Sequence, residues 1–216
     1  MKEYKNIIFD VGDVLFDYRW FEMLLEYGLN EEEAKRVGNQ MFDDPLWLQL
    51  DLEIMPREDI IRGFEEKYPA DAKAMRWFLD HGELMHIPRT DVWKKFHELK
   101  EKGYHIYLLS NYSSDLFHKH TKGASFLDDI DGMVVSYQVH VKKPEPEIYH
   151  CLLEKYGLKA EECIFFDDRA ANTEAAEKLG IRSVTITSKE VLLEQMDTLL
   201  EQKSTDIMKR VASSCG

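Results

Sequence analysis

The chain has 216 residues, of which 44% are hydrophobic, enough apolar material for one large domain or two small ones. Its formal net charge of −13 disfavours nucleic acid and anionic membranes as partners, and no apolar run is long enough to span a bilayer. The N-terminus leads directly into a short apolar run and does not resemble a signal peptide. Three cysteines without ligand spacing (Cys151, Cys163 and Cys215) predict reduced thiols, and we therefore expect a cytoplasmic protein.

The first predicted strand, Asn6–Phe9, is followed by a long stretch in which we expect helices and no strand. Four helical patterns punctuated by prolines lie there: Trp20–Tyr27, Glu31–Phe42, Pro56–Lys67 and Asp71–His81. This stretch is too long for a crossover connection within a sheet. We therefore expect residues 17–89 to form a small helical cap domain above a core made of residues 1–16 and 90–216.

Beyond the insert, short apolar runs with little alternation predict buried strands. They are His105–Leu109, Met133–Ser136, Cys163–Phe166 and Ser183–Thr187. The amphipathic patterns between and before them predict helices at Asp91–Lys102, Glu147–Tyr156 and Ala171–Leu179. This alternation predicts a Rossmann-like α/β core with a mostly parallel sheet, and the tail after Gln202 is expected to fray.

Polar residues follow the predicted strands at the edge where an open parallel sheet collects its ligands. They are Asp10, Gly12 and Asp13, then Ser110 and Asn111, then Lys143, and finally Asp167 and Asp168. Crowded carboxylates repel by about 4 kcal/mol per pair at ~4 Å with an effective dielectric constant of about 20. A divalent cation removes that repulsion, and ligands that are all oxygen select Mg²⁺. The pattern therefore predicts a magnesium site suited to phosphoryl transfer.

The same residues resemble four ordered motifs of the haloacid dehalogenase-like (HAD) hydrolase superfamily. The motifs are Phe9-Asp10-Val11-Gly12-Asp13-Val14-Leu15, Leu108-Leu109-Ser110-Asn111, Lys143-Pro144 and Phe165-Phe166-Asp167-Asp168. The resemblance covers essentially the whole chain, because the insert is similar to the helical (C1) cap of that superfamily. Its first and fourth motifs most resemble those of bacterial α-D-glucose-1-phosphate phosphatases.

The resemblance implies a hydrolase that splits a small phosphorylated metabolite, with a sugar phosphate favoured, through an aspartyl-phosphate. In that scheme Asp10 is the nucleophile and a metal ligand, the carbonyl of Gly12 is a second ligand, and Asp168 is a third. Asp167 lies beside the metal, although the two acidic residues could be exchanged. The resemblance also implies that Ser110 and Lys143 bind the phosphate and that Asn111 lines the same pocket. We expect a monomer by default.

One position departs from the family pattern. Most phosphatases of the superfamily have an acid/base aspartate two residues after the nucleophile, where this chain has Gly12. The loss of such a group typically lowers a rate by ~10²–10⁴-fold. A good leaving group, such as an anomeric oxygen, would tolerate that loss, and Asp13 would replace the group only if the turn directed it inward.

Two other functions stay open on the sequence alone. A 2-haloacid dehalogenase also uses an aspartate nucleophile but needs no Mg²⁺, which would leave Asp167 and Asp168 unexplained. A non-catalytic protein that binds a phosphorylated metabolite is the second alternative, and Gly12 favours it.

Several further residues are ambiguous. Tyr18, Arg19 and Trp20 lie where the chain passes from the first motif into the insert, and they could serve either substrate contact or hinge packing. The large aromatic residues of the insert are interpreted as its core, not as a substrate cage: Phe42, Trp47 and Trp77. The histidines are scattered, and His118 and His120 would diverge on a helix, so no zinc site is predicted.

Overall fold

The computed structural model describes residues 4–214. The expectation of no signal peptide rests partly on Met1, Lys2 and Glu3, and the expectation of reduced thiols rests partly on Cys215. These four residues lie outside the described residues. A central sheet contains five parallel strands in the order β5-β4-β1-β6-β7. They are β1 (Asn6–Phe9), β4 (His105–Ser110), β5 (Gly132–Val135), β6 (Cys163–Asp167) and β7 (Arg182–Thr185). All five predicted strands are confirmed, with ends shifted by at most two residues.

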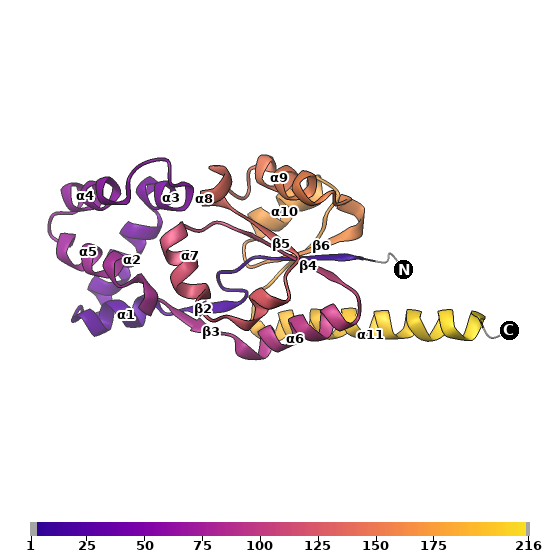
Figure 1. The fold of residues 1–216 in the computed structure, drawn as a ribbon. Coiled ribbons are helices and arrows are strands. Elements are labelled where there is room, and N and C mark those ends of the chain that lie inside the picture. The colour runs from indigo at the N-terminus through magenta and orange to yellow at the C-terminus, as the bar shows by residue number, and fades with distance from the viewer. Residues whose placement is uncertain (1–3, 215–216) are drawn as a thin grey trace.

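Helices cover both faces of this sheet (Figure 1). On one face lie α6 (Thr90–Glu101) and α11 (Lys189–Ser214), and on the other lie α9 (Pro146–Tyr156) and α10 (Ala170–Lys178). Successive residues of β1 point to opposite faces: Phe9 packs on Phe96 of α6 with ring centroids 4.5 Å apart, whereas Ile8 joins a second cluster with Tyr149 of α9. Burial on both faces explains why the strands are uninterrupted apolar runs, and it confirms the Rossmann-like α/β class.

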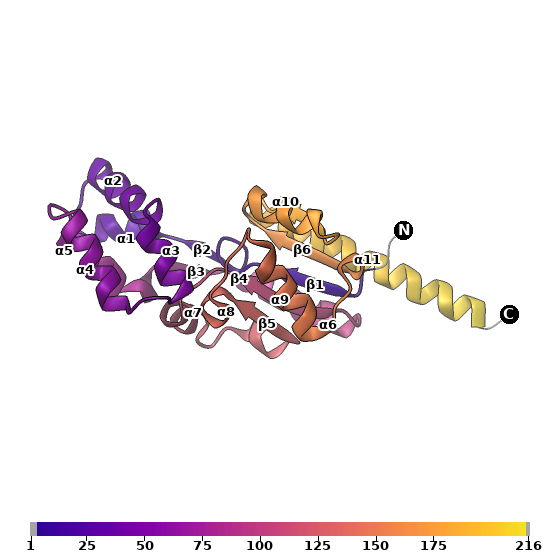
Figure 2. The ribbon, with the colours of Figure 1, turned by 90° about the horizontal axis from the view of Figure 1, so that it is seen from above.

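Five helices within residues 20–80 form the helical insert, which lies beyond the carboxyl ends of the sheet strands in both ribbon views (Figures 1 and 2). They are α1 (Trp20–Tyr27), α2 (Glu31–Phe42), α3 (Pro45–Leu52), α4 (Arg57–Lys67) and α5 (Ala72–Asp80). The sequence did not predict α3, because Pro45 was interpreted as a break. Instead Pro45 occupies the first turn and the side chain of Asp44 caps the helix by accepting from the amide of Leu46. Proline is favoured in that position because its missing N–H has no helical partner to lose.

A short antiparallel ribbon connects the insert to the sheet. It pairs β2 (Phe16–Tyr18) with β3 (His86–Pro88), so the expectation of no strand in this stretch is wrong. Strands of three residues are too short to show a period of two, and only their mutual pairing reveals them. The guanidinium of Arg89 ties the ribbon to the turn after β1, since it donates to Asp17 Oδ1 at 2.9 Å and to the carbonyl of Asp13 at 2.7 Å.

Shorter elements complete the fold: α7 (Ser114–Thr121), α8 (Ser136–Val139) and the 3₁₀ turns η1 (Gly82–Leu84), η2 (Ser125–Asp128) and η3 (Ala160–Glu162). The helix α11 continues to Ser214 and projects beyond the sheet (Figure 2), so the expected fraying after Gln202 is wrong. It begins against the core through buried Leu192, Met196 and Leu199, and no glycine or proline interrupts its continuation to Ser214. Within residues 4–214 no helix combines the length and apolar character that a membrane crossing requires.

Candidate active site

Asp10 lies at the carboxyl end of the central strand and is 7% exposed. Its amide donates to the carbonyl of Phe166 on β6 at 2.9 Å, which fixes its backbone between two strands. Its Oδ1 accepts from the amide of Val11 at 2.7 Å and from the Ser110 hydroxyl at 2.6 Å. The same oxygen lies 2.8 Å from the Nζ of Lys143. Within residues 4–214 no donor contacts Oδ2, so this is the oxygen available to a ligand.

Lys143 is held rigidly although it lies outside the strands. The side-chain amide of Asn111 donates to the carbonyl of Lys143 at 2.9 Å and accepts from its backbone N–H at 2.8 Å. The Lys143 ammonium, 2% exposed, lies between Asp10 and Asp167, at 2.8 and 2.6 Å. Burial opposes its charge, but these two carboxylates raise its pKa. Asn111 was expected to line the phosphate pocket; it does line the cavity, yet its amide is occupied in positioning Lys143.

The two acidic residues after β6 have different surroundings. Asp167 is fully buried and accepts from the amide of Arg169 at 2.8 Å and from Asn172 Nδ2 at 2.9 Å, besides its contact with Lys143. Asp168 is half-buried, lines the cavity and, within residues 4–214, accepts a hydrogen bond to its carboxylate from no other residue. The carboxylate oxygens of Asp168 are therefore more available to a ligand than those of Asp167, as expected for the residue that contacts a ligand directly.

The three carboxylates together fit a divalent cation. Asp10, Asp167 and Asp168 each offer an oxygen, and these atoms lie within 4.8 Å of one another. Burial, together with the neighbouring carboxylates and against the pull of Lys143, raises the pKa of Asp10 to about 7. Burial and the charges of Asp167 and Asp13 raise that of Asp168 to about 6. Lys143 therefore does not fully neutralise the negative charge of the three carboxylates, and their oxygens are hard ligands of the kind that Mg²⁺ prefers.

A cavity of about 460 Å³ opens over these residues, between the sheet and the insert. Its floor contains Asp10, Ser110, Lys143 and Asp168, and its other side contains Phe42, Trp47 and Asp51 from the insert. This volume is in the range of sites for small molecules. The structure therefore brings together all the residues predicted for the site, with Asp167 buried just behind the cavity lining.

The turn after Asp10 is tight. Asp13 has a positive φ of 50°, is exposed, and accepts from the amide of Tyr18 at 3.3 Å. Its carboxylate is thus held by the turn. Gly12 lines the cavity, and the space where its side chain would extend is filled by the ring of Tyr18.

Sequence patterns did not reveal several polar groups of the cavity region. Asp51 is half-buried, and burial raises its pKa to about 7 against the opposing charges of Arg169 and two lysines. Tyr112 and His120, from the end of β4 and from α7, are buried and hydrogen-bonded to each other at 2.8 Å. Their only sequence signal was polar character next to apolar residues, which does not distinguish them from surface groups.

An open parallel sheet with a cavity above a buried aspartate, a lysine and further carboxylates defines an α/β enzyme whose chemistry centres on an acidic side chain. The chain belongs to the haloacid dehalogenase-like hydrolase family, whose model matches residues 4–180. The hydrolase class and the superfamily expected from the four motifs are thereby confirmed.

Three known proteins illustrate this relationship. A sesquiterpene phosphatase of Aspergillus oryzae is 25% identical over 186 residues, covering 85% of this chain and 90% of its own. A D-ribitol-5-phosphate phosphatase of Bacteroides thetaiotaomicron is 30% identical over 88 residues, covering 38% of this chain and 43% of its own. The crystal structure of a HAD family enzyme from the same bacterium, in complex with magnesium and inorganic phosphate, is 25% identical with a TM-score of 0.68, covering 84% of this chain and 93% of that one.

Proposed function

We propose that the protein is a Mg²⁺-dependent phosphatase that acts on a small phosphorylated metabolite through an aspartyl-phosphate on Asp10. The observation that carries this proposal is the position of Asp10: it is buried, lies at the end of the central strand and lines the cavity, and three donors hold its Oδ1. The hydrolase family and the phosphatase names of relatives support the same reaction class.

In the first step Oδ2 of Asp10 attacks phosphorus, and the bond from phosphorus to the leaving-group oxygen breaks. Lys143 and Ser110, which already contact Oδ1, fix the carboxylate and donate to the phosphoryl oxygens as charge develops on them. In the second step water attacks phosphorus and releases the Asp10 carboxylate. A bound Mg²⁺, held by Asp10, Asp168 and the carbonyl of Gly12, would supply positive charge for the phosphoryl group. Asp167 would neutralise Lys143 from behind.

Mg²⁺ is expected to raise the melting temperature of the protein and to be required for hydrolysis of an aryl phosphate. A ligand that binds only the folded state at about 100 times its Kd stabilises it by about 2.7 kcal/mol. Thermal unfolding with and without Mg²⁺, together with phosphate release before and after EDTA, measures both effects. Asp168→Asn should abolish the Mg²⁺-induced shift. Phosphate release that persists in EDTA would contradict the proposed role of Mg²⁺. Halide release from a 2-haloacid in EDTA, without phosphate release from any substrate, would favour a dehalogenase, whose displacement at carbon needs no metal.

The substrate that we favour carries hydroxyl groups on its leaving group, as a sugar phosphate does. Asp51 belongs to α3 and lines the cavity, and its carboxylate accepts no hydrogen bond within residues 4–214. A half-buried acceptor of this kind suits a hydroxyl donor. Phe42 and Trp47, in T-shaped contact at 4.6 Å, offer apolar faces beside it. The D-ribitol-5-phosphate phosphatase name of one relative agrees with this choice, whereas the sesquiterpene phosphatase name does not.

Asp51→Asn is expected to raise KM for the preferred sugar phosphate by about tenfold, because a charge-assisted hydrogen bond contributes about 1.5–3 kcal/mol. Kinetics with an aryl phosphate, which has no hydroxyl group, provide the internal control and should change little. A screen of phosphorylated metabolites with Mg²⁺ identifies the substrate for this comparison. An equal effect on both substrates would contradict a role for Asp51 in recognition.

We also propose that residues 17–89 act as a cap that closes over the cavity, with the β2–β3 ribbon as its attachment. The arrangement of the cavity supports this role, because one side comes from the sheet edge and the other from the insert. A non-catalytic sensor would use the same pocket, but it would bind a phosphorylated metabolite without releasing phosphate, which the screen also detects.

A further inference from the structure

Gly12 stands where a side chain has no room. A Cβ built on Gly12 would lie 2.5 Å from the hydroxyl oxygen of Tyr18 and 2.8 Å from its Cε2. Gly12 is not among the described glycines with a positive φ, so its backbone conformation does not require glycine. The requirement comes from Tyr18, whose hydroxyl fills the position that a side chain two residues after Asp10 would take. Both residues line the cavity together with Asp10.

The Tyr18 hydroxyl begins a chain of hydrogen bonds that leads away from the cavity. It donates to the hydroxyl of Tyr112 at 2.5 Å, and the Tyr112 hydroxyl lies 2.8 Å from Nδ1 of His120. Nε2 of His120 lies 2.7 Å from the carbonyl of Gly82, which can only accept. Nε2 therefore carries the proton, and Nδ1 accepts from Tyr112. The whole chain is directed from Tyr18 to His120, which leaves the lone pairs of the Tyr18 oxygen available on the cavity side.

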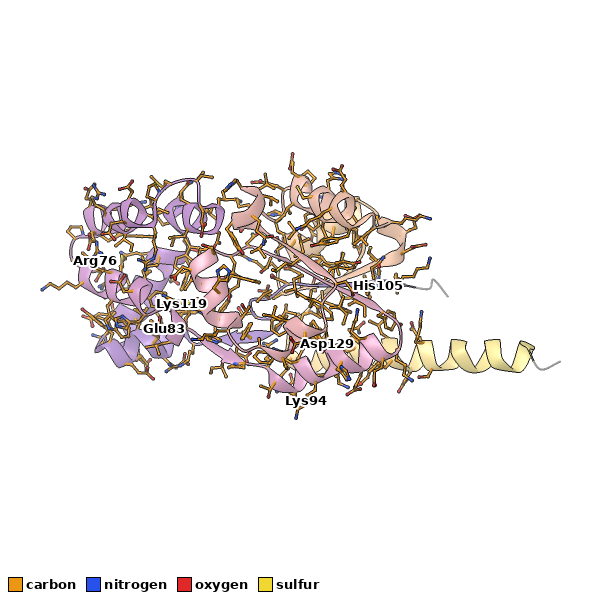
Figure 3. All side chains as sticks on the ribbon, in the orientation of Figure 1. Arg76, Glu83, Lys94, His105, Lys119 and Asp129 are labelled. Carbon is orange, nitrogen blue, oxygen red and sulfur yellow. The ribbon has the colours of Figure 1, made fainter. Side chains whose placement is uncertain are left out.

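The far end of the chain is enclosed and fixed. His120 is 2% exposed and stacks on His86, with ring centroids 4.2 Å apart. An ion pair of 3.6 Å between Lys119 and Glu83, both labelled in Figure 3, joins α7 to η1 beside the His120–Gly82 hydrogen bond. Burial lowers the pKa of His120 to about 4, which is close to the basicity of an ordinary aspartate. His120 is thus about as basic as the aspartate carboxylate that most phosphatases of the superfamily have at the position of Gly12.

We propose that Tyr18, backed by Tyr112 and His120, replaces the missing acid/base carboxylate and serves as the base for hydrolysis of the aspartyl-phosphate. The inference rests on the proposed function. As the water oxygen bonds to phosphorus, the bond from phosphorus to Asp10 breaks and the electron pair returns to the carboxylate. The water proton passes to the Tyr18 oxygen, the Tyr18 proton to Tyr112, and the Tyr112 proton to Nδ1 of His120. The proton returns along the same chain to the leaving-group oxygen of the next substrate. Tyr18 is the catalytic residue, and Tyr112 and His120 act through it.

The test is pre-steady-state kinetics of Tyr18→Phe with an aryl phosphate and Mg²⁺. An aryloxide leaves without being protonated, so the first step should need little from Tyr18 and kcat/KM should change little. The second step should slow by ~10²–10⁴-fold, the usual contribution of general base catalysis. Aryloxide release should therefore show a burst equal to the enzyme concentration, and a phosphoenzyme should accumulate and be trapped by acid quenching. Tyr112→Phe, which keeps the Tyr18 hydroxyl but interrupts the chain, should show the same burst with a smaller loss of kcat.

The matched control is Tyr107→Phe. This change alters a buried tyrosine in the core cluster that contains Ile8 and Tyr149, so the variant should keep the kcat of the unaltered protein and show no burst. Equal falls in kcat and kcat/KM without a phosphoenzyme would overturn the inference, because a structural defect affects both steps. Wild-type kcat in both Phe variants would also overturn it, while leaving the proposed phosphatase function intact. An unaltered protein that releases no phosphate from any substrate would overturn both.

Discussion

Replacing Asp10 by asparagine is expected to lower kcat for phosphate release by ~10⁴-fold or more, because the amide cannot form the aspartyl-phosphate. Neither neighbouring carboxylate can substitute for Asp10. Asp167 is enclosed by Lys143 and Asn172, and Asp168 follows β6, whereas Asp10 follows β1. The protein should remain folded, since Lys143 keeps Asp167 as its partner at 2.6 Å. Phosphate release from an aryl phosphate and a thermal unfolding curve measure the two outcomes.

Asp13→Asn is the matched control, because it makes the same chemical change three residues away in the same turn. Asparagine tolerates the positive φ of this position, and its side-chain oxygen can still accept from the amide of Tyr18. Most of the activity should survive. Full activity of Asp10→Asn would exclude the aspartyl-phosphate mechanism.

Replacing Lys143 by methionine is expected to have the largest effect on stability. The change keeps much of the side-chain volume but leaves Asp10 and Asp167 buried without a cation between them. Breaking a buried ion pair from one side typically costs about 3–5 kcal/mol. For a domain of this size the melting temperature should fall by roughly 6–20 °C. Turnover should also be lost, because Lys143 is the proposed donor to the phosphoryl oxygens.

The double variant Lys143→Met with Asp167→Asn separates these two effects. Removing one of the uncompensated carboxylates should restore part of the stability, so the double variant should unfold at a higher temperature than Lys143→Met alone. Activity should stay low because the ammonium is still absent. Free energies of unfolding that simply add would show that Lys143 and Asp167 do not interact, contrary to their 2.6 Å contact.

The sequence predicted the sheet well for a physical reason. A strand buried on both faces, such as Ile164–Phe166, must be apolar along its whole length, and this pattern is visible without any knowledge of neighbours. The β2–β3 ribbon was missed because three residues show no period and the partner of Phe16 is 72 residues away at Pro88. The helix α3 was missed because proline can either stop a helix or begin one, and the capping bond of Asp44 decides between them.

Some residues of the candidate site were likewise predictable from the sequence, and others were not. Asp10, Ser110 and Asp168 were predictable because each ends or directly follows a buried strand, and parallel strands end at one edge. The role of Asn111 was not predictable, since its amide bonds to the backbone of Lys143, 32 residues away. Asp51 was also missed, because it lies on a helix that the sequence did not predict.

The amino-acid sequence by itself determined the chemistry that the edge of the sheet can present: carboxylates and a hydroxyl at the ends of strands, and a lysine in the loop between α8 and α9. Their convergence follows from the parallel direction of the strands, because the carboxyl ends of parallel strands lie at the same edge of a sheet. Only the tertiary structure decided what fills the place beside Gly12. The ring of Tyr18 reaches it because the β2–β3 ribbon folds back over the turn, and its partners Tyr112 and His120 come from distant segments. A contact between side chains so far apart in the chain has no local signature, because it depends on packing and not on the residues next to it.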